Sequence, residues 1–221
     1  MDSSILFSLG LSIRVAILAT LGVVVIGLPI AYILAMKKFW GRELIDMLTT
    51  LPLVLPPTVT GYYLIVLVGR NGVIGRYIYA WTGWSIMFTW YAAALASFIV
   101  AMPLMIRTSR AAIESVDKNL INASYTLGHS ELNTAIKVIL PLSRKGILAG
   151  AVLSFARAIG EFGATLMLAG NIPGKTDTMP LAIYSFASAG EWSYAHAYVI
   201  ILTLMSCFII YIANRYSRRI I

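Results

Sequence analysis

Two charged residues, Arg157 and Glu161, lie within an otherwise apolar run from Gly146 to Ala169. They are four residues apart, so on a helix they share one face. A charge in membrane hydrocarbon costs about 2.5–3.5 kcal/mol on insertion scales, which favours two charges that pair or face water. Gating or lining of a solute path is one role, and a structural pair that holds the bundle or a dimer seam is the other. Gly160 and Gly163 permit close helix approach or a local break beside them.

A second candidate segment is the uncharged run Met47–Gly69, which carries Pro56 and Pro57 near its middle. Proline lacks an N–H donor, so the pair predicts a broken span, although a simple proline kink remains open. Thr58 or Thr60 could cap the helix that restarts. Its free N–H groups and positive dipole end would suit an oxyanion. The candidate path residues of both segments are Pro56, Pro57, Thr58, Thr60, Arg157, Gly160, Glu161, Phe162, Gly163 and Thr165.

The longest polar interval of the chain runs from residue 107 to residue 145. Its periodicity predicts a helix, a turn at Gly128 and a second helix that Pro141 ends. A turn this sharp demands positive φ or close contact, which glycine permits. The candidate caps are Asp117 or Asn119 for the first helix and Ser130 for the second. A structured loop of this size on a membrane domain predicts a partner that it contacts.

Composition places these segments in a membrane. Hydrophobic residues make up 59% of the 221 residues and charged residues only 12%, whereas soluble domains have about 25%. We therefore expect an all-α integral membrane protein, with residues 1–221 forming one domain. A span needs roughly 20 apolar residues. The five expected spans are residues 5–36, 47–69, 85–106, 146–169 and 192–214, with Gly170–Glu191 as a loop between the last two.

The net charge of +8 is explained by the orientation of the chain in the membrane, so a nucleic acid partner is not needed to account for it. With five spans the termini lie on opposite sides, and basic residues favour the cytosol. This predicts an outer N-terminus, a cytosolic C-terminus and a cytosolic polar interval over residues 107–145. The inner side then holds Lys37, Lys38, Arg42, Arg107, Arg110, Lys118, Lys137, Arg144, Lys145, Arg215, Arg218 and Arg219, and the outer side holds Arg70, Arg76 and Lys175.

The polar interval contains the pattern Asn122-Ala123-Ser124-x3-Gly128-x9-Val138-x-Leu140-Pro141. This pattern resembles the EAA loop of ABC-importer permeases, E-A-A-x3-G-x9-I-x-L-P, with three departures, at residues 122, 124 and 138. The resemblance implies a coupling helix that sits in a cleft of an ATPase subunit, and small residues at 123 and 124 would let that partner approach. An ordinary helical hairpin is the alternative. The candidate coupling residues are Asn122, Ala123, Ser124, Leu127, Gly128, His129, Leu140 and Pro141.

Two further stretches, Leu51–Tyr63 and Ala156–Thr165, are followed by Gly170-Asn171-Ile172-Pro173-Gly174-Lys175-Thr176. Together they resemble the molybdate permease subunits of ABC importers, which are similar to tungstate and sulfate permeases. The resemblance implies a type I permease fold, a homodimer, and alternating access driven by two ATPase subunits. It also implies an extracytoplasmic oxyanion-binding protein, a prokaryotic plasma membrane, and ATP and Mg bound on the ATPase, with no cofactor in this chain.

Other readings of the sequence are weaker. Residues 169–176 nearly fit a phosphate-binding loop, but Ala169 replaces its first glycine and Pro173 deletes an N–H group. We expect this outer loop to contact a docked binding protein. His129 and His196 fall on opposite sides of the membrane and cannot share a metal. A self-contained secondary anion transporter would favour internal repeats and ionisable residues on several spans, and a membrane enzyme would need a nucleophile–base or metal-ligand set.

Overall fold

The structure is a computed structural model that describes residues 2–219, with side chains described for residues 4–211. Its regular secondary structure in that range is entirely helical, which confirms the expected fold class. The helices are α1 (Asp2–Met36), α2 (Arg42–Val54), α3 (Pro57–Val68), α4 (Gly75–Thr82), α5 (Trp90–Glu114), α6 (Lys118–Thr126), α7 (Glu131–Thr134), the π-turn η1 (Ala135–Ile139), α8 (Leu140–Ile159), α9 (Gly163–Ala169), α10 (Met179–Ser188) and α11 (Trp192–Arg219).

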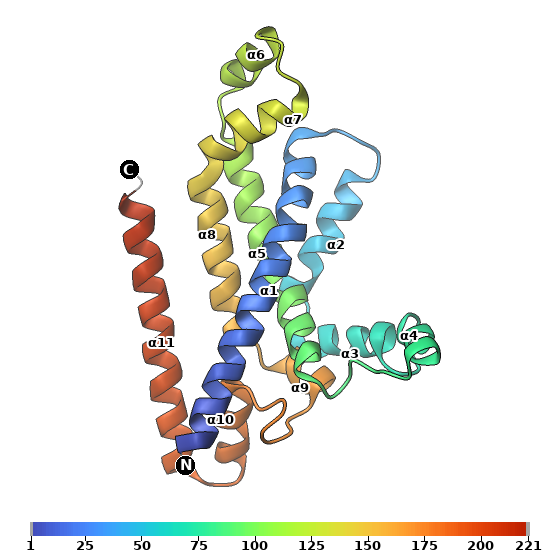
Figure 1. Cartoon of the computed structure of the whole chain (residues 1–221), viewed down its shortest axis with the longest axis vertical. Helices are drawn as coiled ribbons and strands as arrows, with labels where there is room; N and C mark the ends of the chain where they lie inside the picture. The colour runs from blue at the N-terminus through green and yellow to red at the C-terminus, as the bar shows by residue number, and fades with distance from the viewer. Residues whose placement is uncertain (1, 220–221) are drawn as a thin grey trace.

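Figure 1 shows a bundle in which α1, α5, α8 and α11 run lengthwise. Four stretches in the described part of the chain are long and apolar enough to cross a membrane: Ser4–Met36, Trp90–Glu114, Glu131–Ile159 and Trp192–Tyr211. The expected second span is present as two shorter helices, α2 and α3. The hairpin of α6 and α7 projects at one end of the bundle, and α3 with α4 projects sideways near the other.

Small residues let the central helices α1, α5 and α8 approach closely. The buried alanines Ala16, Ala19, Ala101 and Ala158 lie in one cluster between these helices. Two hydroxyls cross-link α5 to α8, because Ser97 Oγ donates to the carbonyl of Ala158 and Ser154 Oγ donates to that of Ala101, each at 3.3 Å. Small residues and interhelical hydrogen bonds of this kind hold helices together in lipid, where hydrophobic burial contributes little.

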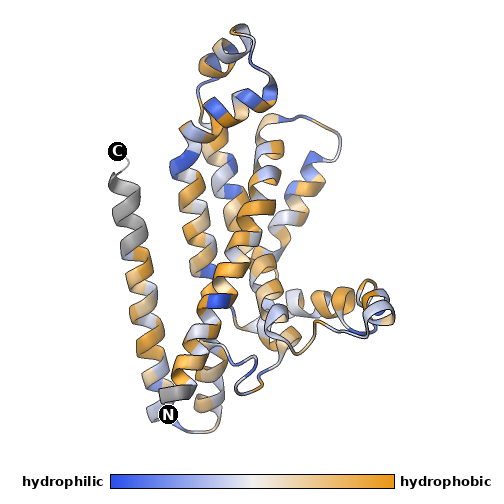
Figure 2. Ribbon diagram, viewed as in Figure 1, coloured by the Kyte–Doolittle hydropathy of each residue, from blue (hydrophilic) through white to orange (hydrophobic). Residues whose placement is uncertain are grey.

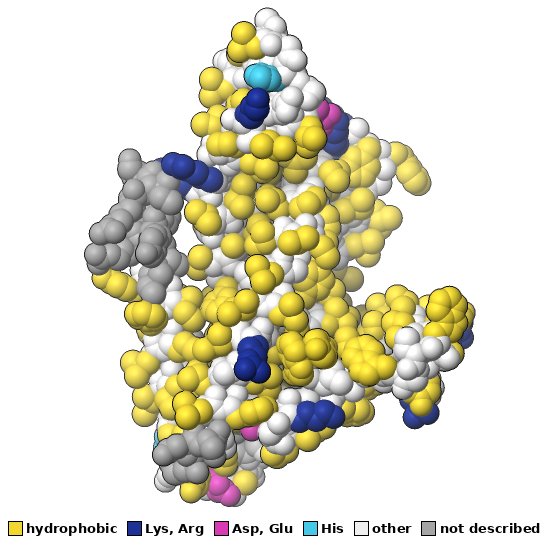
Figure 3. Space-filling model, in the orientation of Figure 1, with side chains coloured by type: hydrophobic (Ala, Val, Ile, Leu, Met, Phe, Trp, Pro, Cys, Tyr) yellow, Lys and Arg dark blue, Asp and Glu magenta, His cyan; other side chains and the backbone are white. Residues whose placement is uncertain are grey.

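The outer surface of the bundle is apolar, as a membrane location requires. Figure 2 shows hydrophobic residues along the lengthwise helices, and Figure 3 shows hydrophobic side chains over most of one face. Exposed examples are Leu21 and Val25 on α1 and Leu204 and Phe208 on α11. The N- and C-termini lie at opposite ends of the bundle. Arg215, Arg218 and Arg219, which were assigned to the hairpin side, lie outside the residues whose side chains are described.

The loop expected over Gly170–Glu191 is wrong, since it contains the helix α10. The turn residues end early: Gly170 and Gly174 have φ of +66° and +72°, and an apolar helix starts at Met179. The backbone N–H of Met179 donates to Ser12 Oγ on α1 at 2.8 Å, so a distant helix supplies the cap of α10. With only ten residues, α10 is too short to cross a membrane by itself.

Candidate translocation path and coupling site

The second span breaks between α2 and α3, as the two prolines predict. Leu55 is extended (φ −71°, ψ 143°), which is the conformation that a following proline favours. The helix restarts from Pro56, whose carbonyl accepts from the N–H groups of Val59 at 2.9 Å and Thr60 at 3.1 Å. This excludes a simple kink, because the extended Leu55 separates two distinct helices and the span is not one continuous bent helix.

The expected threonine cap of α3 is wrong. Pro56 occupies the N-cap position, and no side chain caps the helix. Thr58 and Thr60 lie inside the first turns, beyond the position from which a side chain caps a helix start. Thr58 is exposed, whereas Thr60 is buried with a hydroxyl that has no hydrogen-bond partner among the described residues. An unpaired buried hydroxyl costs about 1–3 kcal/mol, so its presence calls for an explanation.

The fourth span also breaks, and Glu161 lies in the break. Helix α8 ends at Ile159 and α9 begins at Gly163, so the local break allowed by the glycines is confirmed. Glu161 Oε1 accepts from the backbone N–H of Ala164 at 2.9 Å, and Oε2 forms an ion pair with Arg157 Nη1 at 2.8 Å. The Glu161 side chain is only 1% exposed, and that of Arg157 is 30% exposed. Glu161 therefore connects the end of α8 to the start of α9.

The two breaks meet in space. A Cβ atom built on Gly163 would lie 2.9 Å from Pro57 Cβ and 3.4 Å from the backbone nitrogen of Thr58. One built on Gly61 would lie 3.0 Å from Ala164 Cα. Glycine at both positions thus allows α3 and α9 to touch near their first turns. Pro56 and Pro57 lack N–H groups, and those of Val59 and Thr60 bond the Pro56 carbonyl, so the N–H of Thr58 is the donor that this arrangement brings next to the break with the Arg157–Glu161 pair.

An aromatic pair borders this crossing. The rings of Phe162, in the break, and Tyr184, on α10, have centroids 5.2 Å apart. Tyr184 is half exposed, whereas the predicted path residue Thr165 is fully buried and Gly160 is exposed. Sequence reasoning missed Tyr184, because it lies in the segment expected to be a loop. The apolar run from Met179 to Ala189 was the signal that could have revealed the helix.

The polar interval forms the expected hairpin of two capped helices. Asp117 Oδ1 accepts from the N–H of Asn119 at 2.8 Å, which selects Asp117 as the first cap. Ser130 Oγ accepts from the N–H of Asn133 at 3.4 Å at the start of α7. Gly128 has φ +83°, and a Cβ there would meet nothing within 4 Å. The turn therefore needs glycine for its backbone conformation and not for space.

The hairpin presents part of the predicted coupling set to solvent. Asn122, Ala123, Leu127 and Gly128 are exposed, with Leu127 at 79%. A groove of about 410 Å³ runs beside them, and its lining includes Ala123, Leu127, His129, Pro141 and Leu142. An apolar groove next to an exposed leucine is a surface that a partner protein could cover.

Ser124 makes a contact within the hairpin and also lines the groove. It is buried, and its Oγ lies 2.9 Å from Thr134 Oγ1, which is also buried. This hydrogen bond joins α6 to α7 on the inner side of the hairpin. A small residue at 124 therefore serves packing within the hairpin, Ala123 is exposed, and the part of both residues in partner contact stays a prediction.

Pro141 does not end the second helix, contrary to expectation. Residues 131–159 run continuously through α7, η1 and α8, and the N–H of Leu140 donates to the carbonyl of Ala135 across the wider π-turn. Pro141 follows as one of the first residues of α8, where a missing N–H is tolerated. The π-turn thus accommodates the proline and carries the hairpin directly into a membrane-spanning helix.

The base of the hairpin is fixed to α1. Lys37 Nζ, just after α1, lies 2.6 Å from Glu131 Oε2 at the start of α7. Beneath this ion pair, Ile121 and Ile139 form a buried cluster against which Tyr32 and Met36 of α1 pack. A displacement of the hairpin would therefore reach α1 as well as α8. Sequence reasoning missed this connection, since its partners are 94 residues apart.

The loop before α10 is compact. Thr176 Oγ1 accepts from the N–H of Ile172 at 2.9 Å and donates to the carbonyl of Gly170 at 3.3 Å. Ser8 Oγ on α1 donates to Asp177 Oδ2 at 3.2 Å. Burial raises the pKa of Asp177 above its ordinary value of 3.8, and the hydrogen bond from Ser8 opposes part of that rise. Lys175 is exposed at the turn.

Comparisons with known proteins agree with this architecture. Residues 27–221 match the model of the family described as "Binding-protein-dependent transport system inner membrane component". The chain belongs to this family. The Haemophilus influenzae molybdenum transport system permease protein ModB is 48% identical over 81% of this chain and 78% of that protein. The Escherichia coli K12 protein of the same name is 42% identical over 88% and 86%, respectively.

The fold is that of a solved ABC transporter as well. The chain superposes on the MetNI methionine ABC transporter in an inward-facing conformation with a TM-score of 0.79, over 100% of this chain and 98% of the other, at 16% identity. This family member is thus an inner membrane component of an ABC transporter, with the permease architecture expected from the sequence. The roles of its individual path and coupling residues remain predictions.

Proposed function

We propose that this permease carries molybdate into the cell by alternating access, driven by ATP that a separate subunit hydrolyses. The similarity to molybdenum permeases supports the choice of solute. One observation carries the mechanism: the hairpin presents Leu127, Gly128 and its groove beyond the bundle, while its second helix continues into α8. A partner that moves the hairpin would therefore move a membrane-spanning helix.

The proposed assembly is a homodimer with two ATPase subunits and an extracytoplasmic oxyanion-binding protein. ATP and Mg would bind on the ATPase subunits. Support for a second copy comes from the sideways projection of α3 and α4, which leaves Tyr62, Tyr63 and Val66 exposed. Lipid covers apolar side chains elsewhere on the bundle, so it is the projection of this arm, and not its apolar character, that favours packing of a second copy against it.

The proposed orientation puts the N-terminus outside and the hairpin and C-terminus in the cytosol. Lys37, Arg42 and Arg110 lie at the hairpin end of the bundle together with Lys137, in accord with the preference of basic residues for the cytosolic side. The outer loop with Lys175 then faces the binding protein. Docking there and hairpin contact with the ATPase occur at opposite ends of the bundle.

The proposed path passes the crossing of α3 and α9. A tetrahedral oxyanion carries two negative charges and oxygen acceptors on all sides, so it favours N–H donors and a cation. The backbone N–H of Thr58 in the first turn of α3 offers a donor, and the partly exposed Arg157 offers the cation. Glu161 neutralises Arg157 in the resting state and fixes its position. This partial neutralisation keeps binding weak enough for release.

Uptake into proteoliposomes tests the proposal. The permease is reconstituted with its ATPase and binding protein, and labelled molybdate is measured inside the vesicles with and without ATP. Strictly ATP-dependent uptake is expected, with stronger competition by unlabelled molybdate than by tungstate or sulfate. Stronger competition by sulfate or tungstate would reassign the solute. Uptake by the permease alone down an ion gradient would replace the proposal with a secondary transporter.

A further inference from the structure

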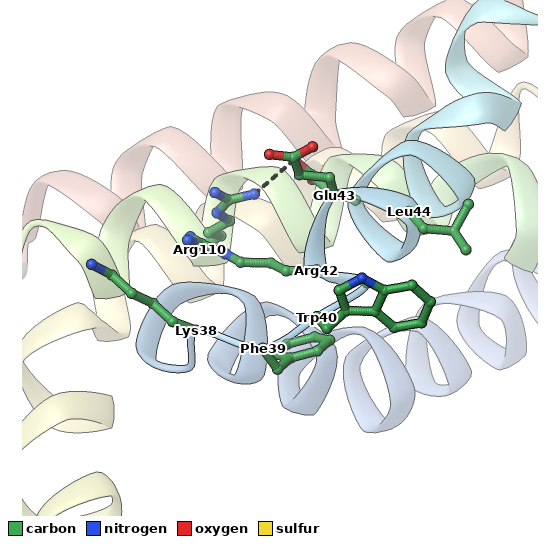
Figure 4. Close-up of a pocket in the computed structure, with 9 residues that line it drawn as sticks. Lys38, Phe39, Trp40, Arg42, Glu43, Leu44 and Arg110 are labelled. Carbon is green, nitrogen blue, oxygen red and sulfur yellow. Dashed lines mark ion pairs between the residues drawn. The ribbon is translucent and has the colours of Figure 1, made fainter.

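A pocket of about 650 Å³ lies where the α1–α2 connection meets α5, at the hairpin end of the bundle. Figure 4 shows Lys38 and Arg110 on one side of this pocket and Trp40 and Leu44 on the other. Its lining is therefore polar and basic at one side and apolar at the other. That division matches an amphipathic ligand better than a small ion or a purely apolar molecule.

The basic side has one cation without an ion-pair partner among the described residues and one with only a long contact. Arg110 is fully engaged, with Asp46 at 2.9 Å and Glu114 at 2.8 Å. Arg42 has only a 3.4 Å contact with the same Glu114 carboxylate. Lys38 has no ion-pair partner among the described residues. Together with Glu114, the carboxylates at 43 and 46 balance the three cations at 38, 42 and 110, so what the pocket offers an anion is the unpaired ammonium of Lys38 and the loosely held Arg42.

The pocket lies at the boundary where bilayer and water meet. The apolar run of α1 ends at Met36, and α2 starts at Arg42 before its own apolar residues begin. Between them the side chain of Trp40 is 100% exposed, and Phe39 beside it is 38% exposed. Exposed tryptophan next to lysine and arginine at a span end is typical of side chains at the level of the lipid headgroups.

We propose that this pocket binds the headgroup of an anionic glycerophospholipid in the leaflet nearest the coupling hairpin. Lys38 and Arg42 contact the lipid phosphate, and Trp40 and Leu44 contact the glycerol region and the first acyl carbons. The inference concerns lipid and does not depend on which oxyanion is transported. It explains why a fully exposed tryptophan and an unpaired lysine stand beside each other in a membrane protein.

The test is native mass spectrometry of the purified full chain with phosphatidylglycerol, using phosphatidylcholine as the comparison lipid. The double variant Lys38→Gln/Arg42→Gln should weaken phosphatidylglycerol binding about thirtyfold, which corresponds to about 1 kcal/mol for each cation. Arg70→Gln/Arg76→Gln removes the same charge at the other end of the bundle and should leave binding unchanged. Equal losses in both variants, or no loss in the first, would overturn the proposal.

A spectroscopic measurement guards against a variant that fails to fold. Phosphatidylglycerol brominated near the headgroup should quench tryptophan fluorescence of the native chain, and Trp40→Phe should lose that quenched component. Inorganic phosphate at the same concentration should not relieve the quenching. Relief by phosphate would indicate a free-anion site, and unchanged quenching in Trp40→Phe would show that lipid does not occupy this pocket. Either result would contradict the proposal.

Discussion

Gly163, the first residue of α9, lies against Pro57, the first residue of α3, so closely that a Cβ on the glycine would be 2.9 Å from the proline Cβ. Each residue starts a helix that resumes after a break within the membrane domain. The contact makes one structural unit of two interrupted spans. It also brings the Arg157–Glu161 pair beside the start of α3.

We expect Gly163→Ala to destabilise the membrane domain by about 1–3 kcal/mol, because neither Pro57 nor the backbone of Thr58 can move away without displacing α3. Thermal melting in detergent would measure the loss, and molybdate uptake should fall with it. The matched control is Gly160→Ala, where the nearest atom lies 3.8 Å from the new Cβ. Equal melting temperatures for the two variants would show that the crossing tolerates a methyl group.

Glu161→Gln should lower stability by about 1–3 kcal/mol, since it keeps an acceptor for Ala164 but leaves Arg157 without a counter-charge. The partial exposure of Arg157 keeps the cost toward the low end. The double variant Arg157→Gln/Glu161→Gln should regain the stability, because no unpaired charge remains. Uptake by the double variant should stay low if Arg157 contacts the anion. Full uptake would assign the pair a structural role alone.

The variant Thr60→Val distinguishes a role of the Thr60 hydroxyl in transport from a role in stability. The Thr60 hydroxyl is buried without a hydrogen-bond partner, so its removal should leave the melting temperature unchanged or raise it slightly. Uptake should nevertheless fall severalfold, because the hydroxyl belongs to the first turns of α3, which the proposed path passes. Thr49→Val on α2 is the control, since that hydroxyl bonds the carbonyl of Ile45 in its own helix. Normal uptake by Thr60→Val would remove this side chain from the path.

The pH dependence of stability should contain a contribution from Asp177. Its pKa is raised in the folded protein, so the folded state binds the proton more tightly than the unfolded chain. The associated stability is complete below the ordinary pKa of 3.8 and is lost as the pH rises through the folded value. An asparagine at this position cannot titrate, so the Asp177→Asn variant does not lose this stability. The difference in melting temperature, variant minus native chain, should therefore increase as the pH rises from 4 to 7.

Ser8→Ala tests the same site from the other side. It removes the hydrogen bond that favours the ionised carboxylate, and the loss of stability with rising pH should therefore become steeper. Parallel curves of melting temperature against pH for the native chain and both variants would show that Asp177 does not contribute.

Local chemistry allowed much of this fold to be predicted from the sequence. Pro56 and Pro57 lack N–H groups, so the break between α2 and α3 followed from their covalent structure. The turn at Gly128 and the caps at Asp117 and Ser130 followed in the same way, since each depends on residues within one hairpin.

The errors arose where backbone geometry or packing that the residue pattern does not report decides the outcome. Helix α10 takes its cap from Ser12, 167 residues away, and no pattern near Met179 reports that bond. Pro141 was expected to end a helix, but the π-turn before it lets the helix continue. The hydrogen bond between Ser124 and Thr134 inside the hairpin was not predicted either. Hydrophobic periodicity predicts which face of a helix is buried, but it does not predict which element packs against that face.

The central claim is that a partner ATPase drives this permease through the hairpin turn at Gly128. The direct test measures ATP hydrolysed and molybdate transported in the same proteoliposomes for Gly128→Val and Gly128→Asn. Valine at φ +83° costs about 1–2 kcal/mol, whereas asparagine visits this conformation readily. We predict that the valine variant keeps hydrolysing ATP but transports about tenfold less molybdate per ATP, and that the asparagine variant stays close to native. Native transport per ATP in Gly128→Val would contradict the account.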